Sequence, residues 1–245
     1  MVSASSFLRK SIFGDFMIVS FASSKGGVGK STSCAALGAA LALKGERVLI
    51  LDLDQNRTLA RRAPKTNIAG LTVKALERDN FTGFFRKVVA SAKYDAILID
   101  LAGTREATVL KAIARSDLVI IPAQASEPDL REALVVVSDI RDVAEEKLGD
   151  IPYRLLLTKI YPLRTRVTDF AYAELARHGL PTFRTALVER AAYREMFLNG
   201  RPPSLTEPTR GAGVEIGALL DEIRDVVGKS AGKTQAKRTR IGGSL

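Results

Sequence analysis

Short apolar runs alternate with amphipathic stretches along the chain from Met17 to about Gly228. Several runs are continuous in Val, Ile and Leu, which is typical of strands that are buried on both faces of a sheet. The apolar runs predict strands at 17–23, 47–53, 95–101, 117–123 and 151–158, with a short one near 182–185. The amphipathic stretches predict helices at 30–44, 80–93, 105–115, 128–147, 165–178, 189–198 and 212–228. This alternation indicates an α/β fold, a doubly wound and mostly parallel sheet with helices on both faces and a ligand site at the carboxyl ends of the strands.

The same pattern divides the chain into three parts. Residues 17–228 form one expected domain, preceded by an extension, 1–16, and followed by a basic tail, 229–245. The Gly, Ser, Thr, Lys and Arg content of the tail indicates disorder, and we expect the extension to be disordered too. The extension lacks the continuous apolar core of a secretion signal, and no run of 18 apolar residues occurs. We therefore expect a cytoplasmic protein without integral membrane association.

Basic residues outnumber acidic ones by 37 to 27, and the two segments with the largest surplus both lie in the last third of the sequence, since the small surplus of 1–153 cancels against the acids of 202–228. The tail carries five basic residues and no acid, and 154–201 has nine basic residues against four acids. Such clustering favours a polyanionic partner, either nucleic acid or an anionic membrane surface, although tails are also basic simply for solubility. The single cysteine, Cys34, excludes an intramolecular disulfide and a multi-cysteine metal site.

A glycine-rich segment joins the first expected strand to the first expected helix, and its sequence is Ser-Ser-Lys-Gly-Gly-Val-Gly-Lys-Ser-Thr over 23–32. Glycines in this position let the backbone wrap around phosphate oxygens, and the helix N-terminus adds free N–H groups and a positive dipole end. Lys30 is expected to reach the β- and γ-phosphates, and Ser31 is expected to ligate Mg²⁺. The expected nucleotide-binding residues are Lys25, Gly26, Gly27, Val28, Gly29, Lys30, Ser31 and Thr32.

Two further strands end in acids. Asp52 and Asp54 close the second expected strand on the same side of the pleat. Asp100 closes the apolar run at 95–101, where a carboxylate is expected to hold Mg²⁺ through its water shell. The spacing from Asp100 to Gly103 fits a switch II loop, whose glycine N–H senses the γ-phosphate. A single acid after a strand is often only a turn or cap residue. The glycine-rich segment, the Asp52 and Asp54 pair and Asp100 follow three different strands, however, and together they favour a nucleotide site.

The glycine-rich segment departs from the ordinary phosphate loop, because Ser24 replaces its first glycine and a second lysine, Lys25, follows. This KGGxGK[ST] form resembles the deviant Walker A motif of the ParA/MinD superfamily of P-loop ATPases, the SIMIBI class, and the resemblance covers about 17–228. It implies ATP and Mg²⁺ as cofactors and an ATP-sandwich homodimer in which Lys25 reaches the partner's nucleotide, with hydrolysis coupled to dissociation. It also implies that Asp54 positions the attacking water near the metal, so Lys25, Lys30 and Asp54 are the expected catalytic residues.

Three features of the sequence indicate which base the protein binds and which branches of the superfamily it resembles less. The chain has Thr-Lys-Ile-Tyr at 158–161 in place of the Asn-Lys-x-Asp element of guanine-specific enzymes, which favours adenine. The lone Cys34 excludes the reductase-type relatives, which bridge an iron–sulfur cluster with paired cysteines. The last expected helix carries four acids against one arginine on its polar face, so membrane binding of the MinD type is the weaker interpretation.

ParA-like relatives bind DNA non-specifically through basic residues, and 154–201 supplies candidates. Two arginines flank a turn after the 151–158 strand, two are spaced i, i+4 on the predicted 189–198 helix, and one follows that helix. The candidate DNA contacts are Arg164, Arg166, Arg190, Arg194 and Arg201. Such contacts give salt-dependent, sequence-independent affinity. The alternative is a solvated face on which Glu189 and Glu195 pair with the arginines.

The sequence therefore predicts a Mg-ATP-dependent ATPase of slow basal turnover for plasmid or chromosome partition. Its ATP-bound homodimer is expected to bind duplex DNA of the nucleoid, and a ParB-like partner is expected to stimulate the hydrolysis that releases it. Two alternatives stay open. One is a VirC-type accessory ATPase of DNA transfer, and the other is a MinD-like membrane- or cargo-positioning ATPase that does not bind DNA.

Overall fold

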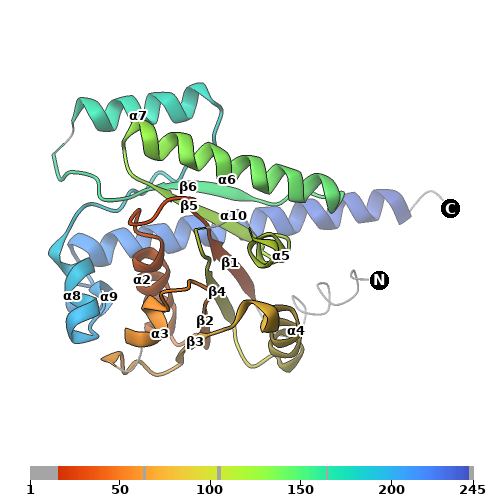
Figure 1. The fold of residues 1–245 in the computed structure, drawn as a ribbon, viewed down its shortest axis with the longest axis horizontal. Helices are drawn as coiled ribbons and strands as arrows, with labels where there is room; N and C mark the ends of the chain where they lie inside the picture. The colour runs from red at the N-terminus through yellow and green to blue at the C-terminus, as the bar shows by residue number, and fades with distance from the viewer. Residues whose placement is uncertain (1–15, 63–64, 104–105, 164, 243–245) are drawn as a thin grey trace.

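Six strands form one sheet in the order β3-β2-β4-β1-β5-β6 (Figure 1). The computed structural model describes residues 16–62, 65–103, 106–163 and 165–242, with 231–242 described by their backbone alone. The strands are β1 (Met17–Phe21), β2 (Val48–Asp52), β3 (Leu71–Ala75), β4 (Ala96–Asp100), β5 (Leu118–Ala123) and β6 (Tyr153–Leu157). All the strand pairs are parallel, so each strand brings its carboxyl end to the same edge of the sheet.

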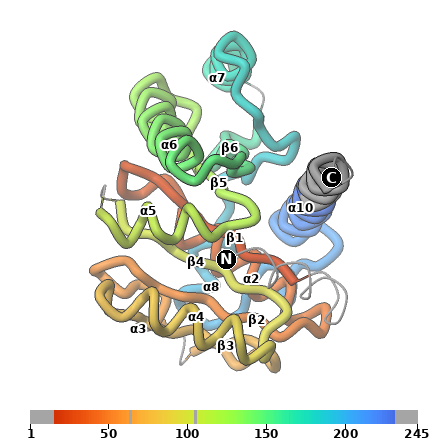
Figure 2. The backbone as a smooth tube through the Cα atoms, turned by 90° about the vertical axis from the view of Figure 1, so that its right-hand side faces the viewer, coloured from red at the N-terminus to blue at the C-terminus, as the bar shows by residue number. Residues whose placement is uncertain are grey.

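Helices connect the strands and cover both faces of the sheet. They are α2 (Lys30–Leu43), α3 (Thr58–Arg62), α4 (Phe81–Ser91), α5 (Ala107–Ile113), α6 (Glu127–Glu146), α7 (Arg166–Arg177), α8 (Ala191–Asn199), α9 (Pro203–Thr206) and α10 (Gly211–Gly242), with a 3-10 turn, η2 (Arg78–Asn80). Figure 2 shows α5 and α6 on one side of the sheet and α10 on the other.

Successive residues of the central strands pack into two separate apolar layers. Along β4, Ile97 and Ile99 belong to the layer covered by α4, α5, α6 and α7, whereas Leu98 belongs to the layer covered by α2, α8 and α10. Burial on both faces explains why the strands are continuous apolar runs rather than alternating ones. The predicted doubly wound α/β fold is confirmed.

Two differences from the predicted elements lie at the edges of the sheet. The sequence prediction did not include β3, an edge strand in which half-buried and exposed residues alternate, and its Leu-Thr-Val-Lys-Ala sequence has that alternation. The strand predicted near 182–185 is wrong, because Thr182 makes only an isolated bridge with Leu155. The backbone N–H groups of Arg184 and Thr185 donate instead to the carboxylate of Glu222 on α10, which replaces a strand partner.

The last helix continues past its predicted end. The backbone of α10 is helical to Gly242, within the tail that was expected to be disordered. The Ala, Lys, Gln and Arg residues of this segment favour a helix, which the composition argument overlooked. Within the described residues, no helix combines the length and the apolar character that crossing a bilayer requires. Apart from Phe16, the 1–16 extension lies outside the described residues.

Candidate functional site

The glycine-rich segment 23–32 forms a loop that leaves β1 and leads directly into α2. Gly29 is the N-cap of α2 and has φ 89°, a left-handed conformation that glycine adopts without a steric penalty. The hydroxyl of Thr158, just beyond β6, donates to the Val28 carbonyl over 2.6 Å and attaches the loop to the sheet. The loop N–H groups therefore lie at the positive end of a 14-residue helix, an arrangement that suits phosphate.

Lys30 is buried and lies between two carboxylates. Its Nζ donates to Asp100 Oδ1 over 3.1 Å and lies 3.5 Å from Asp54 Oδ2. Burial raises the pKa of Asp100, and the Lys30 charge and the Ser31 hydroxyl oppose that rise. Among the described residues, the buried Asp100 Oδ2 finds no hydrogen bond of regular geometry. A buried carboxylate oxygen without a donor is a suitable ligand for a cation.

The two acids at the end of β2 have different roles. Asp52 is buried, and its Oδ2 accepts hydrogen bonds from the backbone N–H groups of Leu59 and Ala60 at 2.9 and 3.0 Å. Asp52 therefore fixes the start of α3. Asp54 is partly exposed and lines the cleft beside the phosphate loop, as does Gly103 after β4.

The second lysine of the loop is held by the start of α6. Lys25 Nζ lies 2.8 Å from Asp129 Oδ1, and the Asp129 side chain is only 4% exposed. The N-cap hydroxyl of Ser126 donates to the other oxygen of Asp129 over 2.5 Å, and Ser24 donates to Glu132 Oε2 over 2.7 Å. The sequence prediction did not include these contacts, although the Ser-x-x-Asp spacing at 126–129 is a capping pattern that places Asp129 at a helix start.

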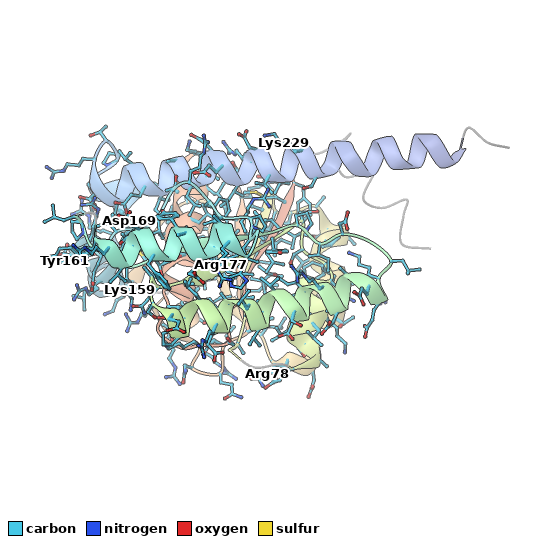
Figure 3. The ribbon with its side chains drawn as sticks, turned by 90° about the horizontal axis from the view of Figure 1, so that it is seen from above. Arg78, Lys159, Tyr161, Asp169, Arg177 and Lys229 are labelled. Carbon is cyan, nitrogen blue, oxygen red and sulfur yellow. The ribbon has the colours of Figure 1, made fainter. Side chains whose placement is uncertain are left out.

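An open cleft of about 550 Å³ joins these groups. The phosphate loop lies on one side, Asp54 and Asn56 on another, and Lys159 together with the segment 187–197 on a third. Figure 3 places Lys159 and Tyr161 at the end of the molecule from which α7 starts. The cleft-lining residues of the loop are Lys25, Gly26, Gly27, Gly29, Lys30, Ser31 and Thr32, while the Val28 side chain is buried. The predicted loop residues are thus brought together with Asp54 and Gly103 in a space large enough for a nucleotide.

The described candidate arginines belong to two separate parts of the fold. Arg164 lies outside the described residues. Arg166 begins α7, which Figures 1 and 2 show far from α8. Arg190 precedes α8 with an extended backbone at φ −129° and ψ 147°, so its predicted place on the helix with Arg194 is wrong. Arg194 lies on α8, and Arg201 follows it.

Glu215 of α10 explains the position of Arg190. Its carboxylate accepts hydrogen bonds from Arg190 Nε at 2.6 Å, from the Tyr193 hydroxyl at 2.9 Å and from the Val188 N–H at 3.1 Å. These three donors hold the chain extended until α8 begins at Ala191. Burial raises the pKa of Tyr193 well above its usual range, and the charge of Glu215 adds to that rise. The sequence interpretation placed Glu215 on a polar face, but its partners come from outside its own helix.

A phosphate loop, a buried lysine–carboxylate pair and a cleft at the carboxyl edge of a parallel sheet define a P-loop nucleotide-binding protein. A family model described as VirC1 protein matches residues 16–201. The chain belongs to this family.

Similar proteins support the same class. A protein named ParA from Rhizobium radiobacter is 32% identical over 199 residues, which cover 75% of this chain and 83% of the relative. The protein virC1 of Rhizobium rhizogenes is 30% identical over 191 residues, with coverage of 75% and 81%. The solved structure of the septum site-determining protein MinD from Pyrococcus horikoshii, complexed with Mg-ADP, has a TM-score of 0.66 at 19% identity and covers 88% of this chain and 98% of its own. The predicted membership of the ParA/MinD superfamily is confirmed.

Proposed function

We propose that this protein is a Mg-ATP-dependent ATPase whose ATP-bound homodimer binds duplex DNA without sequence preference. One observation carries the ATPase part of the proposal, namely the buried pairing of Lys30 with Asp100, next to Asp54, where the phosphate loop opens α2. The family match and the Mg-ADP of the similar MinD structure support ATP and Mg²⁺ as its ligands. Hydrolysis by the protein alone is slow in this proposal.

The residues of the cleft divide the chemistry between them. Lys30 and the loop N–H groups bind the β- and γ-phosphates, and Ser31 with Asp100 holds Mg²⁺. The buried Asp100 Oδ2, which accepts no hydrogen bond of regular geometry from the described residues, fits that cation. Mg²⁺, when bound, neutralises charge on the phosphate oxygens. Asp54 accepts a hydrogen bond from the attacking water and orients it, and the Gly103 N–H contacts the γ-phosphate.

Lys25 is assigned to the nucleotide of the partner subunit. Its side chain is 44% exposed at the cleft, although its Nζ pairs with the buried Asp129. To reach a phosphate across an interface, Lys25 exchanges this carboxylate for the phosphate. Dimer formation then depends on ATP, and loss of the γ-phosphate weakens the dimer.

Plasmid or chromosome partition is the leading role. The relative named ParA and the basic surplus of 154–201 support duplex DNA as the partner and association with the nucleoid. A ParB-like protein is the proposed stimulator of hydrolysis. The VirC1 family match favours a second role, in which the same ATP cycle acts in DNA transfer.

A MinD-like role without DNA is the third candidate, and α10 weighs against its membrane-binding form. The apolar face of the first half of α10, including Ile216, Leu220 and Ile223, is fully buried against its own domain. A helix that binds lipid needs an exposed apolar face. The fold similarity to MinD therefore supports a shared nucleotide cycle rather than a shared target.

The test is retention of plain duplex DNA on a filter with ATP, with ADP and without nucleotide, across a salt series. We expect retention with Mg-ATP at low salt and a steep loss as salt rises. Absence of ATP-dependent retention at low salt would contradict DNA binding and leave the MinD-like role. Phosphate release with and without DNA, in the same samples, separates an ATPase from a scaffold that only binds nucleotide.

A further inference from the structure

Four exposed basic residues belong to the two segments that meet where α3 approaches the end of α8, and the sequence prediction included only one of them. We name this surface the basic junction, and its residues are Arg61, Arg62, Lys65 and Arg201. All four residues are exposed. Three of them come from 57–65, which holds four basic residues and no acid, and the fourth follows α8 more than 130 positions later.

Close packing fixes the two halves of the basic junction against each other. The Arg62 guanidinium lies 4.9 Å from the centre of the Phe197 ring of α8, and Lys65 Nζ lies 3.5 Å from the Leu198 carbonyl oxygen. Gly200 has φ 72°, and a Cβ there would lie 1.8 Å from the carbonyl oxygen of Lys65, so only glycine allows this approach. Figure 1 shows α3 and α8 next to each other at the cleft end of the molecule.

Arg190 and Arg194, next to the basic junction, have acidic partners, whereas the junction residues have none among the described residues. Arg190 pairs with Glu215 at 2.6 Å and Arg194 with Glu189 at 3.1 Å, as the alternative interpretation of a solvated face expected for Arg194. Within the described part of the chain, no carboxylate lies within 4.0 Å of the basic groups of the four junction residues. Like charges on two segments that pack against each other repel one another, and an anion that binds them relieves that repulsion.

We propose that the basic junction contacts the phosphate backbone of duplex DNA and supplies most of the DNA affinity that was predicted for the arginines of 164–201. This inference rests on the proposed DNA-binding function. Three of the four cations are guanidinium groups, whose planar fork suits phosphate oxygens. Among the described residues near them in sequence, the exposed large apolar side chains are Leu198, at 70%, and Leu205, at 46%, which is too little apolar area for insertion into a lipid surface.

Both halves of the basic junction start from residues that line the nucleotide cleft. Thr58, the first residue of α3, lines it on one side, and Arg194 and Phe197 of α8 line it on another. Arg62 in turn lies on the Phe197 ring. A nucleotide that contacts either wall can therefore change the spacing of the phosphate-binding groups, which links this surface to the nucleotide state.

The test uses the full-length variant Arg61→Glu/Arg201→Glu, which changes one exposed residue in each half and leaves the Arg62–Phe197 contact intact. The matched control is Arg86→Glu/Arg177→Glu, which makes the same charge change at exposed residues of α4 and α7. We expect the junction variant to bind DNA between about tenfold and a hundredfold more weakly in Mg-ATP at 0.1 M salt, with the salt slope reduced by about 2. Basal phosphate release should equal that of the wild type.

Two results would overturn the inference while the proposed function stands: wild-type DNA binding by the junction variant, or an equal loss in the control variant. Wild-type protein that never retains DNA contradicts the proposed function and the inference together. A parallel arm measures sedimentation with phosphatidylserine vesicles. Vesicle binding that requires Arg61 and Arg201, with DNA binding unchanged, assigns the surface to lipid and overturns the inference.

Discussion

The phosphate loop and the α8 region carry the two groups of charges on which the proposed function depends, and they are built in opposite ways. In the loop, Lys30 is buried between Asp54 and Asp100, and each charge has its partner inside the site. Near α8 the basic side chains are exposed or half-buried, and those of Arg190 and Arg62 contact Glu215 of α10 and the Phe197 ring. A phosphate site is thus formed mainly by one short segment of the sequence. A DNA-binding surface depends instead on whether the fold brings acidic residues close to the basic ones.

The largest effect is expected on nucleotide binding, from a substitution in the phosphate loop. Lys30→Ala removes the buried cation that faces the phosphates, and we expect nucleotide binding to weaken about a thousandfold, since two charge-assisted contacts of roughly 1.5–3 kcal/mol each are lost. Titration with a fluorescent ATP analogue measures this. Lys44→Ala, at the exposed far end of α2, is the matched control and should bind normally. A Lys30→Ala protein that is folded by circular dichroism and binds within tenfold of the wild type contradicts the assignment.

A substitution of Asp54 is expected to change ATP hydrolysis far more than ATP binding. Asp54→Ala leaves Lys30 paired with Asp100, so nucleotide affinity should stay within about threefold while phosphate release falls about a hundredfold, because the water loses its acceptor. The ATP-bound dimer should persist. Gln55→Ala, at the exposed neighbouring position, should retain turnover. Normal turnover of Asp54→Ala would refute the catalytic role.

The ion pair between Lys25 and Asp129 predicts that substitutions of its two residues change dimer formation in opposite directions. Lys25→Ala should reduce ATP-dependent dimer formation and hydrolysis about tenfold without changing ATP affinity. Asp129→Asn removes the carboxylate that holds Lys25 in the monomer, so the dimer should form at about fivefold lower protein concentration, equivalent to about 1 kcal/mol. Sedimentation velocity over a protein concentration series measures both. Loss of dimer in both variants would show instead that Asp129 positions Lys25 for its task.

The smallest expected effect is on stability, and it differs between two arginines that are four positions apart. Arg190→Ala leaves the Glu215 carboxylate, 12% exposed, without its cation, and we expect the free energy of unfolding to fall by about 1–2 kcal/mol. Arg194→Ala breaks only a surface pair with Glu189 and should cost about 0.5 kcal/mol or less. Thermal unfolding by circular dichroism compares the two variants. Equal melting temperatures would mean that the Glu215 contacts do not hold the start of α8.

The parts of the molecule that could be predicted from sequence are those fixed by local pattern. The apolar runs identified β1, β2, β4, β5 and β6, and the glycine spacing identified the loop. The edge strand β3 was missed because it is short and half exposed, although its sequence does show the alternation of apolar and polar residues that is typical of a strand.

The contacts that were missed join residues far apart in sequence. Asp129 meets Lys25 across more than 100 positions, and Arg62 meets Phe197 across more than 130. No periodicity or spacing contains such pairs. The predicted helical spacing of Arg190 and Arg194 failed for the same reason, because the helix start is set by Glu215 rather than by the residues of α8 themselves.

The most direct test of the ATP-dependent switch is the mass of the wild-type protein in solution with Mg²⁺ and either a non-hydrolysable ATP analogue or ADP, measured by light scattering after size exclusion. The chain has a mass of 26.5 kDa. We expect twice that mass with the ATP analogue and the single-chain mass with ADP. The same single-chain mass in both states, at protein concentrations where the analogue is shown to be bound, would contradict the central claim that the γ-phosphate controls dimer formation.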